Sequence, residues 1–97
     1  MAAKPGMVKG AETYWVLRKD QLSCLASPVR MDIIDHLAGR PPTSIRDLAV
    51  RIGKRPSAIY HHLRQLVAVG LAVEAGAQVL NRKSERLYST PAPRVRL

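Results

Sequence analysis

The segment Asp47–Leu71 constrains this chain most, because its residues are arranged as two short helices joined by a tight turn. Leu48 and Ile52 fall on one face of the first helix, and Gly53 supplies a residue that can end a helix with positive φ. Pro56 suits the first turn of the second helix, where a backbone N–H is not needed. The segment therefore predicts a helix-turn-helix.

The second helix, predicted over residues 56–69, has one apolar face and one polar face. Ile59, Leu63 and Leu66 recur at helical spacing, so they bury one stripe. The opposite face carries side chains that can hydrogen-bond base edges or phosphates, and the N-terminal half of such a helix is expected to enter the major groove of DNA. The predicted reading face consists of Ser57, Tyr60, His61, Arg64 and Gln65.

Beyond Gly70 the apolar pattern changes from helical towards alternating, which favours strands. Residues 71–90 predict a β-hairpin with an irregularity at Gly76 and a polar turn at residues 81–84. Beside a helix-turn-helix, such a hairpin is a wing that lies over the sugar-phosphate backbone or reaches a minor groove. The basic residues expected to hold the DNA backbone from the helix turn and the wing are Lys54, Arg55, Arg82, Lys83 and Arg86.

The charge of the chain is strongly positive and unevenly distributed. The formal net charge is +9, and residues 40–97 hold eleven of the 16 Lys and Arg residues against three acidic ones. Nucleic acid is the commonest partner of a chain with this charge, so we expect it to bind double-stranded DNA. A chain of 97 residues makes one domain with little room for an enzyme cleft, and no catalytic triad or phosphate-binding loop is present. The sequence therefore predicts a protein that is not an enzyme and has no cofactor.

Metal, membrane and disulfide chemistry are not expected. Cys24 is the only cysteine, which excludes an intramolecular disulfide and fits a reducing cytoplasm; we expect it to be buried. His61 and His62 are neighbours that diverge on a helix, so they cannot bind one metal ion from that helix alone, and His62 is expected to be packed. No apolar run approaches the ~20 residues of a membrane span. We therefore predict a cytoplasmic protein with no metal site.

The remaining pattern predicts the domain boundaries and the fold class. We expect a flexible arm over residues 1–10, one domain over residues 11–90 and a disordered tail over residues 91–97. Residues 13–17 favour a strand, although an amphipathic helix remains open, and two helices are expected over residues 20–25 and 28–39. The predicted class is α+β, mostly helical: three to four helices plus a two- or three-stranded β-wing.

The stretches LASPVRMDIIDHLAG and DLAVRIGKRPSAIYHHLRQLVAVGLA resemble the ArsR-like winged-helix regulators, and the resemblance covers residues 22–90. It implies a dimeric transcriptional regulator, expected here to be a repressor, whose DNA affinity an effector alters. Family members that sense soft metals carry a thiolate pair where this chain has Ser44 and Arg46, so the effector is not identified.

A homodimer is expected to form through the apolar N-terminal residues, since the sequence ends before a long C-terminal helix could form. The predicted dimer contacts are Tyr14, Trp15, Leu17 and Leu22. The alternative function is a winged-helix module that docks proteins or structured RNA and does not read DNA sequence. That module would bind DNA weakly, without sequence preference and with steep salt dependence.

Overall fold

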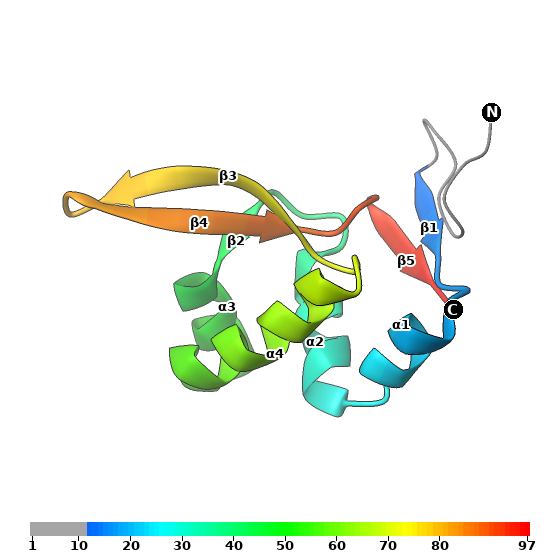
Figure 1. The fold of residues 1–97 in the computed structure, drawn as a ribbon. Coiled ribbons are helices and arrows are strands. Elements are labelled where there is room, and N and C mark those ends of the chain that lie inside the picture. The colour runs from blue at the N-terminus through cyan, green and yellow to red at the C-terminus, as the bar shows by residue number, and fades with distance from the viewer. Residues whose placement is uncertain (1–11) are drawn as a thin grey trace.

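The computed structural model describes residues 12–97, so the arm predicted over residues 1–10 lies outside the described residues. Four helices form a body from which a long hairpin projects (Figure 1). This arrangement confirms the α+β class and the winged helix-turn-helix architecture. The elements are β1 Thr13–Trp15, α1 Lys19–Cys24, α2 Pro28–Leu37, β2 Thr43–Ser44, α3 Ile45–Ile52, α4 Pro56–Ala68, β3 Val73–Leu80, β4 Lys83–Ser89 and β5 Arg94–Arg96.

The core lies among α2, α3 and α4, where the apolar faces predicted from helical spacing meet. Large aliphatic side chains are almost completely removed from water there, and replacing any one of them by alanine would cost about 2–5 kcal/mol. They are Ile33, Leu37, Leu48, Ile59, Leu63, Leu66 and Leu71.

The starts of the two N-terminal helices follow from local chemistry. Ser27 caps α2 by accepting a hydrogen bond from the Arg30 amide, and Pro28 occupies the first helical position. α1 begins at Lys19, with Arg18 as its N-cap, one residue before the predicted start at Asp20. The Asp20 carboxylate lies in the first turn, where it suits the positive end of the helix dipole, and forms an ion pair with Arg18.

The wing is the larger of two sheets. Its three antiparallel strands lie in the order β2-β4-β3, and Tyr88 of β4 is aligned with Thr43 of β2 and with Glu74 of β3. The register shifts between Glu74 and Ala77, where Gly76 has a φ of 123° that L side chains rarely adopt. The irregularity predicted at Gly76 is therefore confirmed.

A second sheet pairs the two ends of the described chain. β1 and β5 are parallel, with Thr13 aligned with Arg94 and Trp15 with Arg96, and they lie at the opposite end of the molecule from the hairpin tip (Figure 1). This pairing resolves residues 13–15 as a strand. The prediction of a disordered tail over residues 91–97 is wrong, because β5 pairs with β1 and Ala92 is buried.

Candidate nucleic-acid interface

The helix-turn-helix is formed by α3, the turn after it and α4. The Ser44 hydroxyl accepts a hydrogen bond from the Asp47 amide at 3.1 Å, which caps α3. Gly53 ends α3 in the left-handed conformation with a φ of 77°, and Pro56 begins α4. The predicted turn is confirmed, and it leaves α4 with one face against the core and the other in solvent.

The structure places the whole predicted reading face of α4 in solvent, and its role as a DNA contact stays a prediction. The guanidinium carbon of Arg64 lies 5.7 Å from the centre of the Tyr60 ring, so a cation–π contact restrains both side chains. The exposed residues of this face are Ser57, Tyr60, His61, Arg64 and Gln65.

One of these residues, Gln65, is bonded by a side chain from another helix and in turn contacts His61. Arg30 of α2 donates a hydrogen bond to Gln65 Oε1 at 2.7 Å, and Gln65 Nε2 lies 3.3 Å from His61 Nε2. The sequence pattern did not single out Arg30 as a site residue. Arg30 lies on α2, whereas the residues that it contacts lie on α4. The spacing of residues within one helix cannot reveal a contact between two helices.

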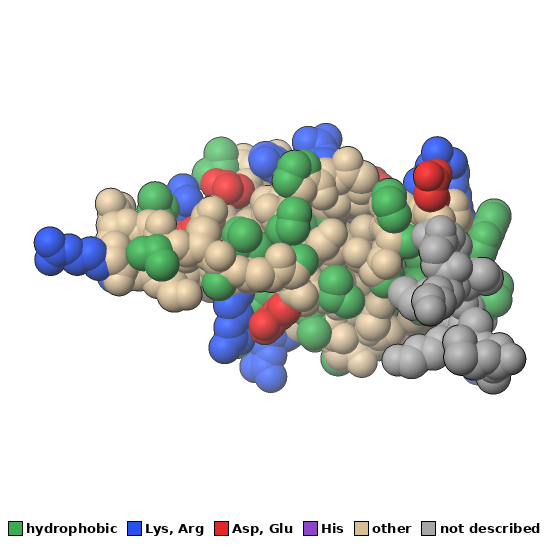
Figure 2. Space-filling model, turned by 90° about the horizontal axis from the view of Figure 1, so that it is seen from above, with side chains coloured by type: hydrophobic (Ala, Val, Ile, Leu, Met, Phe, Trp, Pro, Cys, Tyr) green, Lys and Arg blue, Asp and Glu red, His purple; other side chains and the backbone are tan. Residues whose placement is uncertain are grey.

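The hairpin ends in a tight turn that exposes positive charge. Asn81 and Arg82 have φ values of 51° and 66°, which is the geometry of a two-residue hairpin turn, and Asn suits it better than Arg. Arg82 and Lys83 are exposed, and Figure 2 shows basic side chains at this narrow end of the molecule. The tip is therefore a pair of exposed cations that the hairpin holds away from the helical body.

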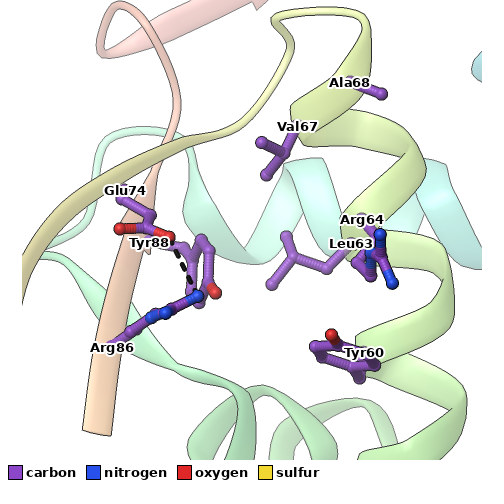
Figure 3. Close-up of a pocket in the computed structure, with 8 residues that line it drawn as sticks. All are labelled: Tyr60, Leu63, Arg64, Val67, Ala68, Glu74, Arg86 and Tyr88. Atoms are coloured by element: carbon purple, nitrogen blue, oxygen red, sulfur yellow. Dashed lines mark ion pairs between the residues drawn. The ribbon is translucent and has the colours of Figure 1, made fainter.

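Arg86 lies apart from the tip, in the middle of β4 and opposite Ala77 of β3. Its guanidinium forms an ion pair with Glu74 at 3.4 Å, so its charge is already partly neutralised. Arg86, Tyr88 and Glu74 line one side of an open groove of about 440 Å³ whose other side is α4 with Tyr60 and Arg64 (Figure 3). The role of Arg86 as a DNA-backbone contact stays a prediction; unlike Arg82 and Lys83, it lies in the groove wall and already has an acidic partner in Glu74.

The acidic residues of the C-terminal part are all paired with arginines. Arg46 of α3 bonds Glu85 of β4 at 3.1 Å and approaches Asp47 at 3.6 Å. The hydrogen bonds that Glu85 accepts from Arg46 and then Gln78 lower the pKa of this carboxyl, so it stays ionised and joins the wing to α3. In residues 12–97, the predicted DNA-binding cations that take part in none of these ion pairs are Lys54, Arg55, Arg64, Arg82 and Lys83.

The N-terminal end of α4 is a second positively charged region. Lys54 and Arg55 are exposed directly before Pro56, and Arg55, the N-cap, makes no side-chain capping hydrogen bond. The positive end of the helix dipole therefore faces solvent beside two cations, which suits a phosphate group.

The predicted dimer contacts divide into two groups. Tyr14 is 6% exposed and its hydroxyl accepts a hydrogen bond from Gln21 at 2.9 Å, so its assignment to a dimer surface is corrected. Trp15, Leu17 and Leu22 are 50%, 65% and 45% exposed and remain available. Alternation along β1 explains the difference, since Tyr14 and Trp15 point to opposite faces of the strand.

Other side chains considered for chemistry have structural roles. Cys24 is buried, and burial raises the pKa of its thiol, which disfavours the reactive thiolate. Ser44 caps α3 and Arg46 bonds Glu85, so both positions equivalent to the soft-metal site are used within the fold. The described part of the chain contains no group of three side chains able to hold a metal ion. None of its helices has the length and apolar character that crossing a bilayer requires.

The sequence and fold of this protein are similar to those of known helix-turn-helix proteins. A family model for the helix-turn-helix domain matches residues 25–74. NolR from Sinorhizobium fredii is similar over 75% of this chain and 67% of its own, with 27% identity and a TM-score of 0.60. A predicted DNA-binding transcriptional regulator from E. coli is 30% identical over 72% of this chain and 68% of its own, with a TM-score of 0.57.

A third solved structure shares the fold at lower identity. It is a homodimeric winged helix-turn-helix DNA-binding domain from Mycobacterium bovis, described as a possible ArsR-family regulator. The identity is 20%, the TM-score 0.58, and the match covers 73% of this chain and 60% of that one. A comparison with curated protein sequences found no match.

The winged helix-turn-helix fold, the family match and the similarity to known regulators show that this protein is a DNA-binding regulator. The chain belongs to the helix-turn-helix domain family.

Proposed function

We propose that this protein is a sequence-specific repressor that binds double-stranded DNA as a homodimer in the cytoplasm. The observation that carries the proposal is the exposed polar face of α4 beside a groove whose opposite wall is the wing. A helix with such a face can enter the major groove while the hairpin follows the adjacent backbone. The resemblance of the sequence to ArsR-like regulators supports repression, and the domain from Mycobacterium bovis shares the fold.

The side chains divide into base-reading and backbone-holding groups. Ser57, His61 and Arg64 lie along the exposed face opposite the buried stripe, where they would meet base edges, with Tyr60 towards the wing and Gln65 towards α2. The backbone contacts are assigned to cations at the start of α4, at the hairpin tip and, after release from Glu74, at the groove wall. They are Lys54, Arg55, Arg82, Lys83 and Arg86.

The proposed dimer forms at the end of the molecule that carries β1, α1 and β5. Trp15, Leu17 and Leu22 are large, exposed and apolar within eight residues of sequence. Large apolar side chains left in solvent so close together in sequence on a small domain suit an interaction surface. A parallel two-stranded sheet is also marginal on its own, because parallel sheets are usually covered on both faces. A second copy of the chain related by a two-fold axis would cover this region.

The test is selection of bound duplexes from a random library, followed by affinity measurements at several salt concentrations. A sequence-specific homodimer selects an inverted repeat and binds it at least ~10³-fold more tightly than scrambled DNA. Weak binding to all duplexes with steep salt dependence contradicts the proposal and favours a module that docks proteins or structured RNA. A matched pair of variants accompanies this test: Arg64→Ala removes a charge from the reading face, and Arg40→Ala removes the same charge from the exposed α2–β2 connection, outside the proposed DNA and dimer surfaces.

A further inference from the structure

The guanidinium of Arg30 joins three groups from α1 and α4. Its Nε donates to the main-chain carbonyl of Cys24 at 2.5 Å, and its Nη1 donates to Gln65 Oε1 at 2.7 Å. The same Nη1 lies 3.2 Å from His62 Nδ1. All three partners are neutral acceptors, so the arrangement serves to orient groups and not to pair charges.

The chemistry of arginine determines the orientation of each partner. A guanidinium has five N–H donors and no acceptor, so any atom that hydrogen-bonds it must accept. The Gln65 atom facing Arg30 is therefore the amide oxygen, and its NH₂ group points to His61. His62 Nδ1 likewise carries no proton, which leaves the proton of its neutral ring on Nε2. Burial, followed by the charge of Arg30, lowers the pKa of His62 and keeps this ring neutral.

The orientation of the Gln65 amide in turn determines which ring nitrogen of His61, on the reading face, carries the proton. Gln65 Nε2 can only donate, so His61 Nε2, 3.3 Å away, is the acceptor in the neutral ring. The proton of His61 then sits on Nδ1. Within residues 12–97, Nε2 of His61 and Oε1 of Gln65 are both occupied, whereas Nδ1–H of His61 and the second N–H of Gln65 are not.

We propose that Arg30 is a positioning residue that sets the hydrogen-bonding polarity of the His61–Gln65 pair, so that both side chains offer donors to DNA. The proposal deepens and rests on the proposed reading role of α4. It explains why an arginine from α2 approaches the polar face of α4 without any acidic partner among the described residues.

The consequence is a specific base preference. Glutamine usually recognises adenine by accepting from N6 through Oε1 while donating to N7 through Nε2. Here Oε1 is turned towards Arg30, so that bidentate pair is not available. A pair of donors instead matches guanine, whose major-groove edge offers the acceptors N7 and O6, and it leaves the amino group of adenine or cytosine without a partner. The inference is that the base facing residues 61 and 65 is guanine.

The first measurement is the ring ¹⁵N spectrum of the histidines in the free protein at a pH where they are neutral. In the wild type we expect His61 protonated on Nδ1 and His62 on Nε2. In Arg30→Met, Gln65 is released and His61 is expected to move to the Nε2–H form that free histidine prefers. A wild-type His61 protonated on Nε2, or a spectrum unchanged by Arg30→Met, would overturn the proposal.

The second measurement compares guanine and adenine at the base pair nearest residues 61 and 65 in the selected duplex. Arg30→Met is expected to reduce the preference for guanine by about tenfold, while Arg30→Lys, which keeps a charged donor group without the planar fork, recovers part of it. Arg40→Met removes the same charge from the exposed α2–β2 connection and should leave the preference unchanged. Equal effects of the Arg30 and Arg40 variants would show that only net charge matters and would reject the positioning role.

A third variant keeps the proposal testable if Arg30→Met does not fold. Gln65 is exposed, so Gln65→Met leaves the core intact while removing the same link to His61. Like Arg30→Met, it should move His61 to the Nε2–H form and reduce the preference for guanine. If His61 carries its proton on Nδ1 in the wild type but no duplex is preferred, the positioning is correct and the proposed reading function is wrong.

Discussion

The side-chain amide of Gln21 donates a hydrogen bond to the main-chain carbonyl of Val69 at 2.9 Å, which ties α1 to the C-terminal end of α4. Gln21 is fully buried, and the same Nε2 also donates to the Tyr14 hydroxyl at 2.9 Å. Helix ends leave carbonyls without partners, and here a distant side chain satisfies one of them. The terminal sheet and the reading helix are therefore connected through one residue.

Gln21→Ala is expected to lower the free energy of unfolding by about 2–4 kcal/mol, because it removes two hydrogen bonds and leaves a cavity. Gln21→Leu should cost less, since it fills the space and also removes Oε1, a buried oxygen that has no partner in the described residues. Urea unfolding of the three proteins measures both effects. Equal stability of Gln21→Ala and the wild type would mean that this connection does not stabilise the fold.

The helix-turn-helix could be predicted from the sequence because its signals are local. Ser44, Gly53 and Pro56 each act within one turn of their own position, and the buried stripe of α4 repeats within one helix. The β1–β5 sheet could not be predicted, because its strands are about eighty residues apart and too short to show a pattern. Because this sheet was not predicted, Tyr14 was wrongly placed on the dimer surface. The alternation of side chains along a strand shows which residues are buried only when the face that the strand buries is known.

For the candidate site, the sequence predicted which face of α4 is exposed but not the contacts that this face makes with other elements. Exposure of the polar face of α4 follows from the helical period, so the sequence predicted that His61 and Arg64 lie in solvent; their contact with DNA stays a prediction. The partners that modify those residues come from other elements: Arg30 lies on α2, and the Glu74 that neutralises Arg86 lies on the neighbouring strand. Contacts between elements depend on packing, which the pattern of one segment does not encode.

Replacing both Arg82 and Lys83 by alanine is expected to weaken binding about equally on all duplexes, because a hairpin tip that touches phosphates carries no direct base information. The slope of log K against log salt should become shallower by roughly one unit for each phosphate that the variant no longer neutralises. Arg40→Ala removes one positive charge from the exposed α2–β2 connection, outside the proposed DNA and dimer surfaces, and is the control for the effect of net charge. An unchanged slope in the tip variant would exclude contact between the wing and DNA.

Arg64→Ala is expected to change which base is preferred at one position, because this side chain lies centrally on the exposed face of α4 and is restrained by Tyr60. Removal of a base-edge hydrogen bond should cost ~1–3 kcal/mol against the preferred duplex and little against scrambled DNA. His61→Ala should act in the same way at a neighbouring base. Competition between preferred and scrambled duplexes measures the ratio, and wild-type specificity in both variants would rule out this face of α4.

The stability of the protein is expected to fall as the pH is lowered from 7 to 5, because of His62. Burial and then the charges of Arg30, His61 and Lys54 lower the pKa of His62 below its ordinary value of about 6.5. The unfolded state therefore binds more protons in this window, so the stabilisation is complete above the unfolded pKa and is lost as the pH falls through the folded one. His62→Gln keeps an acceptor for Arg30 and should reduce the pH dependence of the urea midpoint. The same dependence in both proteins would assign it to other groups.

Leu17→Glu is expected to convert the protein from dimer to monomer, because it places a charge in the exposed apolar cluster with Trp15 and Leu22. A two-fold dimer places its reading helices about one DNA turn apart, ~34 Å, so it requires an inverted repeat. The variant should lose most of its affinity for the repeat while keeping that for a single half-site. Sedimentation at tens of micromolar measures the oligomeric state, with Val50→Glu, on the exposed side of α3, as a control that stays dimeric. A monomeric wild type with a footprint over one half-site would contradict the proposed dimer and its surface.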